Sequence, residues 1–348
     1  MQRLFILMLT LLWGGLAASE SNPQTFEVLS KSPKEIIVKV SVHDFELNAV
    51  KQNNDLLGYL PDIEEGAKHL EKGNPDLQHL TTSLIIDGQN PDIQIIDKKV
   101  KTFSDIEILP SKGNLYRNQD PDNFPYQKGD VYNSNKAFPS EIVNFGKDYQ
   151  FREFKGVPLQ VTPMQYNPVS KELKLFTTIT LKITFQNDPI NSSKRVSREF
   201  SSLYESQFIN YTSSRYQPLA EKGEMLVFTH QNFVQDIEPF VDWKNKIGIP
   251  AKLIRIDTVG SGSAQDIKNY ISTYYQNHNL TFVLLVGDAG YVPTHNLSAG
   301  HSDNAYGYLE GNDSYPEVII GRFSAETSQH VNTMVDRTIA YETGLQNS

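Results

Sequence analysis

The sequence predicts a two-part fold, an antiparallel β-sandwich followed by an α/β subdomain with a parallel sheet. Across residues 25–186 apolar and polar positions alternate, and helical periodicity is almost absent. Alternation with a period of two is typical of strands that bury one face. After Gly223 the apolar residues form short continuous runs with helical segments between them. Such runs are typical of parallel sheets that are covered on both faces.

Composition sets the broad class of the protein. The chain has 348 residues, of which 39% are hydrophobic, which is enough for two ordinary domains with packed cores. The formal net charge of −9 is spread through sequence of mixed sign, so we expect no nucleic-acid partner. The chain contains no cysteine. It therefore has neither disulfides nor a cysteine nucleophile of its own.

Residues 1–19 have the pattern of a secretory signal peptide. Arg3 precedes an apolar run over residues 4–13, and small residues follow as far as Ser19. The run is shorter than the roughly 20 apolar residues that cross a bilayer. No later segment reaches that length, so we expect no membrane span. The signal peptide predicts export and a secreted or cell-surface location.

Three stretches are the clearest strand candidates of the first part. Residues 38–42 and 157–161 alternate valine or leucine with other residues. A turn at 166–168 leads into residues 173–185, whose apolar positions share one phase and predict a long hairpin. Between the first and second of these stretches, residues 111–147 are rich in Asn, Asp, Pro and Gly. A loop of that length is usually functional or mobile.

The second part begins after a polar stretch. Residues 187–223, which include the basic pair Lys194 and Arg195, predict an exposed linker. Helical segments with apolar residues three and four apart follow, and Ser263 begins one of them as a cap. Because strand and helix alternate, right-handed crossovers should build a parallel sheet. The predicted buried strands are residues 225–228, 253–256, 282–286 and 318–320.

Asp288 is a candidate site residue because of its place after a strand. Ligands of an open parallel sheet gather at the carboxyl ends of the strands. Asp288 directly follows the run at 282–286 and Gly287, which allows a sharp exit from the strand. The alternative is an aspartate that caps its own loop, and the residues alone favour that interpretation.

The turn at residues 310–317 is a candidate cation site. It brings Glu310, Asp313 and Glu317 together between two predicted strands. Calcium binds roughly six to eight oxygens from short loops of this kind. The order is not that of an EF-hand, and a solvated acidic turn is an equal alternative. The two histidines of the preceding loop have no recognisable nucleophile beside them, and no complete catalytic set is present.

The second part resembles one family closely. The segments that carry the resemblance are 240–245, 282–288, 302–307, 311–315, 317–324 and 336–342. In sequence and order they are similar to the gingipains, the caspase-like cysteine peptidases of secreted bacterial proteins. Residues 164–168 and the strand after them resemble the gingipain propeptide. The resemblance implies a β-sandwich propeptide over 20–215 and an incomplete N-terminal subdomain of the peptidase domain over 216–348.

The resemblance also implies a processing point. The sequence around Arg215 is similar to the maturation point of the family, which implies cleavage after Arg215 and a mature chain beginning at Tyr216. The propeptide would inhibit the peptidase domain and assist its folding, with Arg215 in the pocket for the residue before the scissile bond. A guanidinium suits such a pocket because it pairs bidentately with a buried carboxylate. An exposed linker arginine without a partner is the alternative.

The catalytic dyad of the family is a histidine and a cysteine, both expected beyond Ser348. We therefore expect this chain to hold no catalytic residue and to be inactive alone. Its partners would be its own downstream catalytic subdomain and, in the complete cysteine endopeptidase, protein or peptide substrates. The alternative is a stand-alone secreted binding or inhibitory protein with a residual half peptidase domain. The resemblance implies structural calcium at Asp288 and, for a second ion, at Glu310, Asp313, Tyr315 and Glu317.

Overall fold

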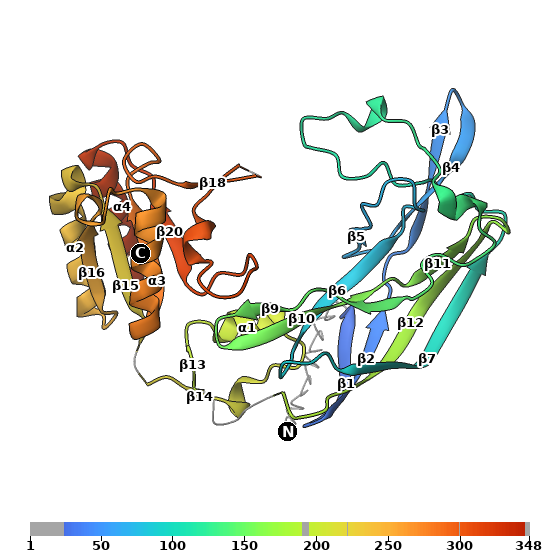
Figure 1. Cartoon of the computed structure of the whole chain (residues 1–348), viewed down its shortest axis with the longest axis horizontal. Coiled ribbons are helices and arrows are strands. Elements are labelled where there is room, and N and C mark those ends of the chain that lie inside the picture. The colour runs from blue at the N-terminus through green and yellow to red at the C-terminus, as the bar shows by residue number, and fades with distance from the viewer. Residues whose placement is uncertain (1–23, 190–194, 221, 299, 345–348) are drawn as a thin grey trace, which may run out of the picture.

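The computed structural model describes residues 24–189, 195–220, 222–298 and 300–344. The predicted signal peptide lies outside these ranges. The described chain forms an N-terminal β-rich half and a C-terminal α/β half (Figure 1). None of the helices in these ranges is long and apolar enough to cross a membrane.

The first sheet of the N-terminal half is built around its longest strand, β12. β12 pairs antiparallel with β2, β7 and β11, and β1 pairs antiparallel with β2. The turn between β11 and β12 lies at residues 168–171, which confirms the predicted long hairpin. The strands are β1 (Phe26–Ser32), β2 (Glu35–Ser41), β7 (Asp92–Phe103), β11 (Met164–Asn167) and β12 (Glu172–Thr184).

The second sheet is also antiparallel and packs against the first. β10 pairs with β6, β8 and β9, and β5 pairs with β6. Val38 of β2, Leu159 of β10 and Leu181 of β12 are fully buried in the shared core. The predicted β-sandwich is therefore confirmed. The remaining strands are β5 (Ala67–Lys68), β6 (Gln78–Ile85), β8 (Val143–Phe145), β9 (Tyr149–Phe151), β10 (Phe154–Val161) and the separate hairpin of β3 (Glu46–Gln52) and β4 (Asp55–Asp62).

The long loop over residues 111–147 has some regular structure. It contains the 3-10 turns η1 (Pro121–Asn123) and η2 (Asp130–Asn133) and ends in β8. Within η2, the buried Tyr132 donates its hydroxyl to the carbonyl oxygen of Ile108 at 2.8 Å. This part of the loop is therefore fixed to the sandwich.

The prediction of an exposed linker is wrong for residues 195–218, which are folded onto the N-terminal half. Strand β13 (Arg195–Val196) pairs in parallel with β14 (Gln217–Pro218), and α1 (Ser201–Gln207) and η3 (Ser213–Arg215) lie between them. Aromatic residues three and four apart turn inward, while the polar residues that suggested exposure face outward. The aromatic cluster comprises Tyr149, Phe151, Phe154, Phe200, Tyr204, Phe208, Tyr211 and Tyr216.

The α/β half confirms the predicted parallel sheet. Its strand order is β16-β15-β17-β20, and every pair is parallel. Residues of α2 and α4 pack on one face of the sheet, and residues of α3 pack on the other. The strands are β15 (Glu224–Thr229), β16 (Ala251–Arg255), β17 (Leu280–Val286) and β20 (Ile319–Phe323), and the helices are α2 (Val234–Lys246), α3 (Ala264–Asn277) and α4 (Ser328–Glu342).

The two halves meet at one end of the sandwich. In Figure 1 the end that carries β9, β10 and α1 lies nearest the α/β half, while the rest of the sandwich extends away from it. Hydrogen bonds from Gln150 and Arg152 to the α/β half show that this end is in direct contact.

Candidate processing and cation sites

Arg215, the residue before the predicted cut, has a carboxylate partner inside the N-terminal half. Its Nη2 donates to Asp188 Oδ2 at 2.8 Å, and about a third of each side chain is exposed (30% and 31%). Because water screens such a pair, it contributes about 1 kcal/mol or less. The alternative of an arginine without a partner is therefore wrong.

Tyr216, the residue after the predicted cut, is buried in the aromatic cluster. Its ring stacks on Tyr211 with centroids 5.1 Å apart and meets Phe154 edge-on at 5.0 Å. Burial raises the pKa of its hydroxyl. Its backbone N–H donates to Ser213 O, and the next two residues form β14. The bond after Arg215 therefore lies within folded structure on both sides.

The first strand of the sandwich helps to hold this segment. Lys31 at the end of β1 donates from Nζ to Thr212 Oγ1 at 2.6 Å and to Tyr211 O at 3.3 Å. Burial and the nearby charge of Arg215 lower the pKa of Lys31. The predicted processing segment is thus tied to the beginning of the sandwich as well as to Asp188.

Asp288 lies at the carboxyl end of β17 and caps its own loop. Its Oδ1 accepts the backbone N–H of Gly290 at 2.9 Å and of Tyr291 at 3.2 Å. Gly287 adopts a φ of 123°, and a Cβ there would lie 2.7 Å from Tyr291 Cβ. The loop-capping interpretation is therefore what the geometry shows.

Arg322 of β20 fixes the same loop. It pairs with Asp303 through Nε and Nη2, each at 2.7 Å. Its Nη1 donates to the carbonyl oxygens of Gly287, Asp288 and Val292. The side chain is 12% exposed, so this arginine holds the carboxyl edge of the sheet in one conformation.

The acidic turn contains a buried carboxyl group. Glu317 is fully buried, and its Oε2 accepts the backbone N–H of Leu309 at 2.7 Å and of Glu310 at 3.1 Å. Its Oε1 is buried without a hydrogen-bond partner among the described residues. Burial, together with the charges of Glu310 and Asp313, raises the pKa of Glu317 to about 7.

Asp313 lies at the contact between the halves. Its Oδ1 accepts the N–H of Tyr315, and its Oδ2 accepts the N–H of Gln150 from β9, both at 2.9 Å. The ring of Tyr315 stacks on Tyr149 with centroids 3.8 Å apart. The side chain of Tyr315 is thus used for packing between the halves.

The turn has one feature that fits a cation and one that does not. A cation would satisfy the unpaired Glu317 Oε1 and relieve its repulsion from Glu310 and Asp313. Within the described ranges, however, no three His, Cys, Asp or Glu side chains already converge to hold a metal ion. Asp288 cannot share this ion, because it follows β17 at the carboxyl edge whereas Glu317 precedes β20 at the amino edge.

Arg152 is a buried contact residue that the sequence does not predict. It lies in the turn between β9 and β10 with a φ of 50°, is 6% exposed, and contacts the α/β half. A charged residue in a polar turn predicts exposure. Only the flanking aromatic residues Phe151 and Phe154 signalled that this turn is buried.

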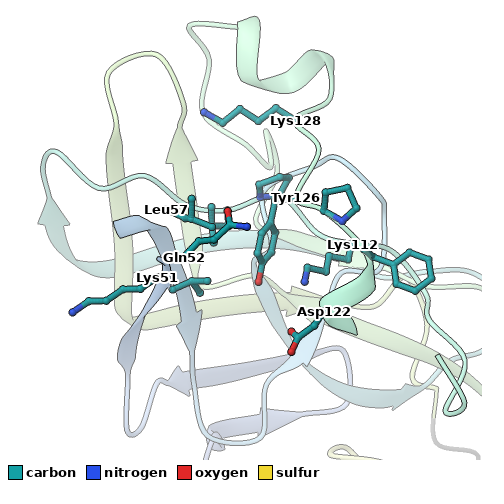
Figure 2. Close-up of a pocket in the computed structure, with 12 residues that line it drawn as sticks. Lys51, Gln52, Leu57, Lys112, Asp122, Tyr126 and Lys128 are labelled. Atoms are coloured by element: carbon teal, nitrogen blue, oxygen red, sulfur yellow. The ribbon is translucent and has the colours of Figure 1, made fainter. Parts of the chain in front are cut away.

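A hollow of about 780 Å³ lies on the N-terminal half, between the β3–β4 hairpin and the loop after β7. Figure 2 shows Tyr126 within it, with Lys112 and Asp122 close by. Lys112 Nζ lies 4.2 Å from the ring of Tyr126 and donates to Pro121 O, and Lys128 pairs with Glu107. These two lysines are already engaged, and the lining carries no catalytic set.

Two family profiles match this chain one after the other. The profile of the C25 propeptide matches residues 17–217, and the profile of peptidase family C25 matches residues 219–348. The two matches adjoin at the segment that contains Arg215 and Tyr216.

Curated relatives come from Porphyromonas gingivalis. Gingipain R2 of strain W83 is 33% identical over 350 residues, which cover 96% of this chain and 47% of the relative. Gingipain R1 is 34% identical over 349 residues, which cover 96% of this chain and 35% of the relative. The chain thus spans about half or less of the length of these relatives. Among solved structures, the complex of the RgpB pro- and mature domains is 29% identical with a TM-score of 0.47, covering 54% of this chain and 98% of that chain.

Proposed function

The chain belongs to peptidase family C25, the gingipains, and from this premise we propose that it is the front part of an exported cysteine endopeptidase zymogen. Its N-terminal half would act as an inhibitory and folding-assisting propeptide, and its α/β half would be the first part of the peptidase domain. The observation that carries this proposal is the order of the two profile matches, which adjoin beside Arg215. The predicted signal peptide is consistent with export.

Maturation would proceed by hydrolysis of the bond after Arg215, giving a peptidase chain that begins at Tyr216. Residues 1–348 contain no cysteine, so the thiol nucleophile would come from a part of the enzyme outside this sequence. In the complete enzyme the thiolate would attack the peptide carbonyl, a histidine would protonate the leaving amine, and water would release the acyl group.

Arg215 would also act as the pseudo-substrate of the uncut zymogen, in the pocket for the residue before the scissile bond. Its guanidinium pairs with Asp188, and this partly exposed pair contributes about 1 kcal/mol or less, so a buried carboxylate of the pocket would be able to replace Asp188 as its partner. Insertion would also require Tyr216 to leave the aromatic cluster. The processing role of Arg215 does not depend on this second role.

We also propose that calcium stabilises the peptidase half. Glu310, Asp313 and Glu317 would supply carboxylate oxygens at the acidic turn, with Tyr315 contributing through its backbone, and Asp288 would belong to a second site. The support at the acidic turn is the buried, unpaired oxygen of Glu317 beside other carboxylates. The ion would neutralise these charges and play no part in the chemistry.

A direct test uses the chain as an inhibitor and as a substrate. Added to a purified arginine-specific gingipain, the chain should slow hydrolysis of a small chromogenic substrate, and it should itself be cut to give a product with Tyr216 at its N-terminus. Arg215→Gln should abolish that product. Failure to inhibit, together with a first cut elsewhere, would remove the zymogen proposal and favour a stand-alone binding protein.

A further inference from the structure

Arg152 crosses from the N-terminal half into the α/β half and is hydrogen-bonded there on several sides. Its Nη1 donates to Leu280 O at 2.9 Å and to Glu317 O at 2.6 Å, and its Nη2 donates to Asn279 Oδ1 at 3.1 Å. Its Nε donates to Glu153 Oε1 at 2.9 Å. A planar guanidinium can satisfy acceptors in these different directions at once, which an ammonium cannot.

The surroundings of Arg152 are built for a buried cation. Phe200 of the N-terminal half and Tyr275 of α3 lie 4.9 and 5.5 Å from the guanidinium carbon. Glu153 supplies the countercharge and itself accepts the hydroxyl of Tyr204 and the N–H of Ser197. The cation is thus balanced by a carboxylate that is fixed in its own half.

Neighbours of Arg152 make a second row of contacts across the same boundary. Tyr149 stacks on Tyr315, the N–H of Gln150 donates to Asp313 Oδ2, and Lys147 Nζ donates to Asn312 O at 3.2 Å. Residues 147–153 are consecutive and contain strand β9. We refer to this segment as the β9 turn.

The β9 turn contacts the amino edge of the parallel sheet. Leu280 begins β17, Asn279 directly precedes it, and Glu317 lies two residues before β20. Asp288 and the loop that Arg322 holds lie at the opposite, carboxyl edge, where parallel sheets bind their ligands. The contact is therefore remote from the edge at which chemistry is expected.

We propose that the β9 turn is an anchoring surface for the propeptide, with Arg152 as its positioning residue, and that it is independent of both the active-site edge and the covalent link at Arg215. Because residues 147–153 lie before the proposed cut and their partners lie after it, the anchor holds the two pieces together once the chain is cleaved. This consequence rests on the proposed processing after Arg215.

The test uses the full chain without residues 1–19, cleaved at Arg215 by an arginine-specific protease. Size-exclusion chromatography should show that the two wild-type pieces remain together. Arg152→Ala removes the donor to the carbonyl oxygens of Leu280 and Glu317 and to Asn279 Oδ1, and it leaves Glu153 without its countercharge. The dissociation constant of the cleaved complex should therefore rise at least about 100-fold. Arg152→Lys should recover only part of this loss. Lys155→Ala is the matched control, because Lys155 pairs with Asp148 in its own half, and it should leave the complex intact.

Hydrogen exchange of the uncut chain separates anchoring from misfolding. In Arg152→Ala, peptides covering 147–153 and 309–317 should exchange faster, while peptides from β2 and β12 should be unchanged. The proposal is overturned if the wild-type pieces separate on cleavage, if Arg152→Ala leaves both the complex and the exchange unaltered, or if exchange rises equally in β2 and β12. A chain that is not cut at Arg215 would refute the processing proposal, whereas the exchange experiment would still decide the anchor.

Discussion

Glu317→Gln should make the α/β half more stable at alkaline pH in the absence of calcium. The carboxyl group is fully buried, and its pKa is raised from 4.5 to about 7 by burial and by Glu310 and Asp313. At pH values between 4.5 and about 7, the carboxyl group is therefore protonated in the folded state and ionised in the unfolded state. Stability contributed by the protonated group is complete below about pH 4.5, falls as the pH rises towards 7, and stays low above it.

The size of the effect follows from the shift. The difference between 7 and 4.5 corresponds to about 3 kcal/mol at about 1.4 kcal/mol per pKa unit. Glutamine keeps an oxygen for the N–H groups of Leu309 and Glu310 but carries no charge. The glutamine NH2 leaves two buried donors unsatisfied where the protonated acid leaves one, so the variant should be about 1 kcal/mol less stable than the wild type near pH 4.5 and exceed it by about 2 kcal/mol at pH 8.

The chain offers a clean probe for this measurement. Its two tryptophans are Trp13 and Trp243, so removal of residues 1–19 leaves only Trp243 of α2 to report on the α/β half. Urea unfolding followed by this fluorescence should be recorded with EDTA at pH 5 and pH 8, and then with calcium. Calcium should stabilise the wild type at pH 8 by more than it stabilises Glu317→Gln, which keeps the proposed second site at Asp288. A variant that is less stable than the wild type at pH 8 in EDTA would refute the argument.

Other substitutions test the processing segment and the carboxyl edge. Tyr216→Ala removes a ring whose burial contributes about 2 kcal/mol, so cleavage after Arg215 by an arginine-specific protease should accelerate at least about tenfold. A short peptide with the same change controls for the sequence preference of the protease. An unchanged rate in the full chain would show that local unfolding of this segment does not limit the cleavage. Asp188→Ala removes an ion pair that is about one-third exposed, and it should accelerate the same cut less than about fivefold in the same time course. Arg322→Ala leaves the carboxylate of Asp303 without its cation and removes a donor from the carbonyl oxygens of Gly287 and Val292. The α/β half should lose about 3 kcal/mol of stability in urea unfolding followed by Trp243, and a loss below about 1 kcal/mol would contradict the role assigned to this arginine.

The fold could be predicted because each half has a regular apolar pattern. Alternation placed β10 and β12, and the continuous apolar runs placed β15, β17 and β20. Burial of one face or of both faces of a strand determines its pattern of apolar residues, and that pattern can be read from the local sequence. The segment at 195–218 was misjudged because its polar residues outnumber the aromatic residues that determine its packing.

The sites were less predictable because they depend on contacts between distant segments. Asp288 could be placed after a strand from sequence, but its capping hydrogen bonds depend on the path of the following loop. Arg152 could not be identified, since its acceptors at Leu280 and Glu317 lie more than a hundred positions away in the chain. Burial of a single charged residue depends on tertiary packing and leaves little trace in local composition.

Because Tyr216 is buried, the proposed cut does not coincide with the end of the folded N-terminal half. The cut proposed after Arg215 would assign Tyr216, Gln217 and Pro218 to the peptidase, yet the tyrosine stacks on Tyr211 and the other two residues pair with β13. After the cut, the new N-terminus of the peptidase would thus remain packed inside the propeptide. Hydrolysis would place an ammonium group on that end, next to an apolar cluster that cannot solvate it. For the propeptide to dissociate, the new N-terminus would have to leave the aromatic cluster and enter water. Once hydrated, its charge would disfavour rebinding to the cluster.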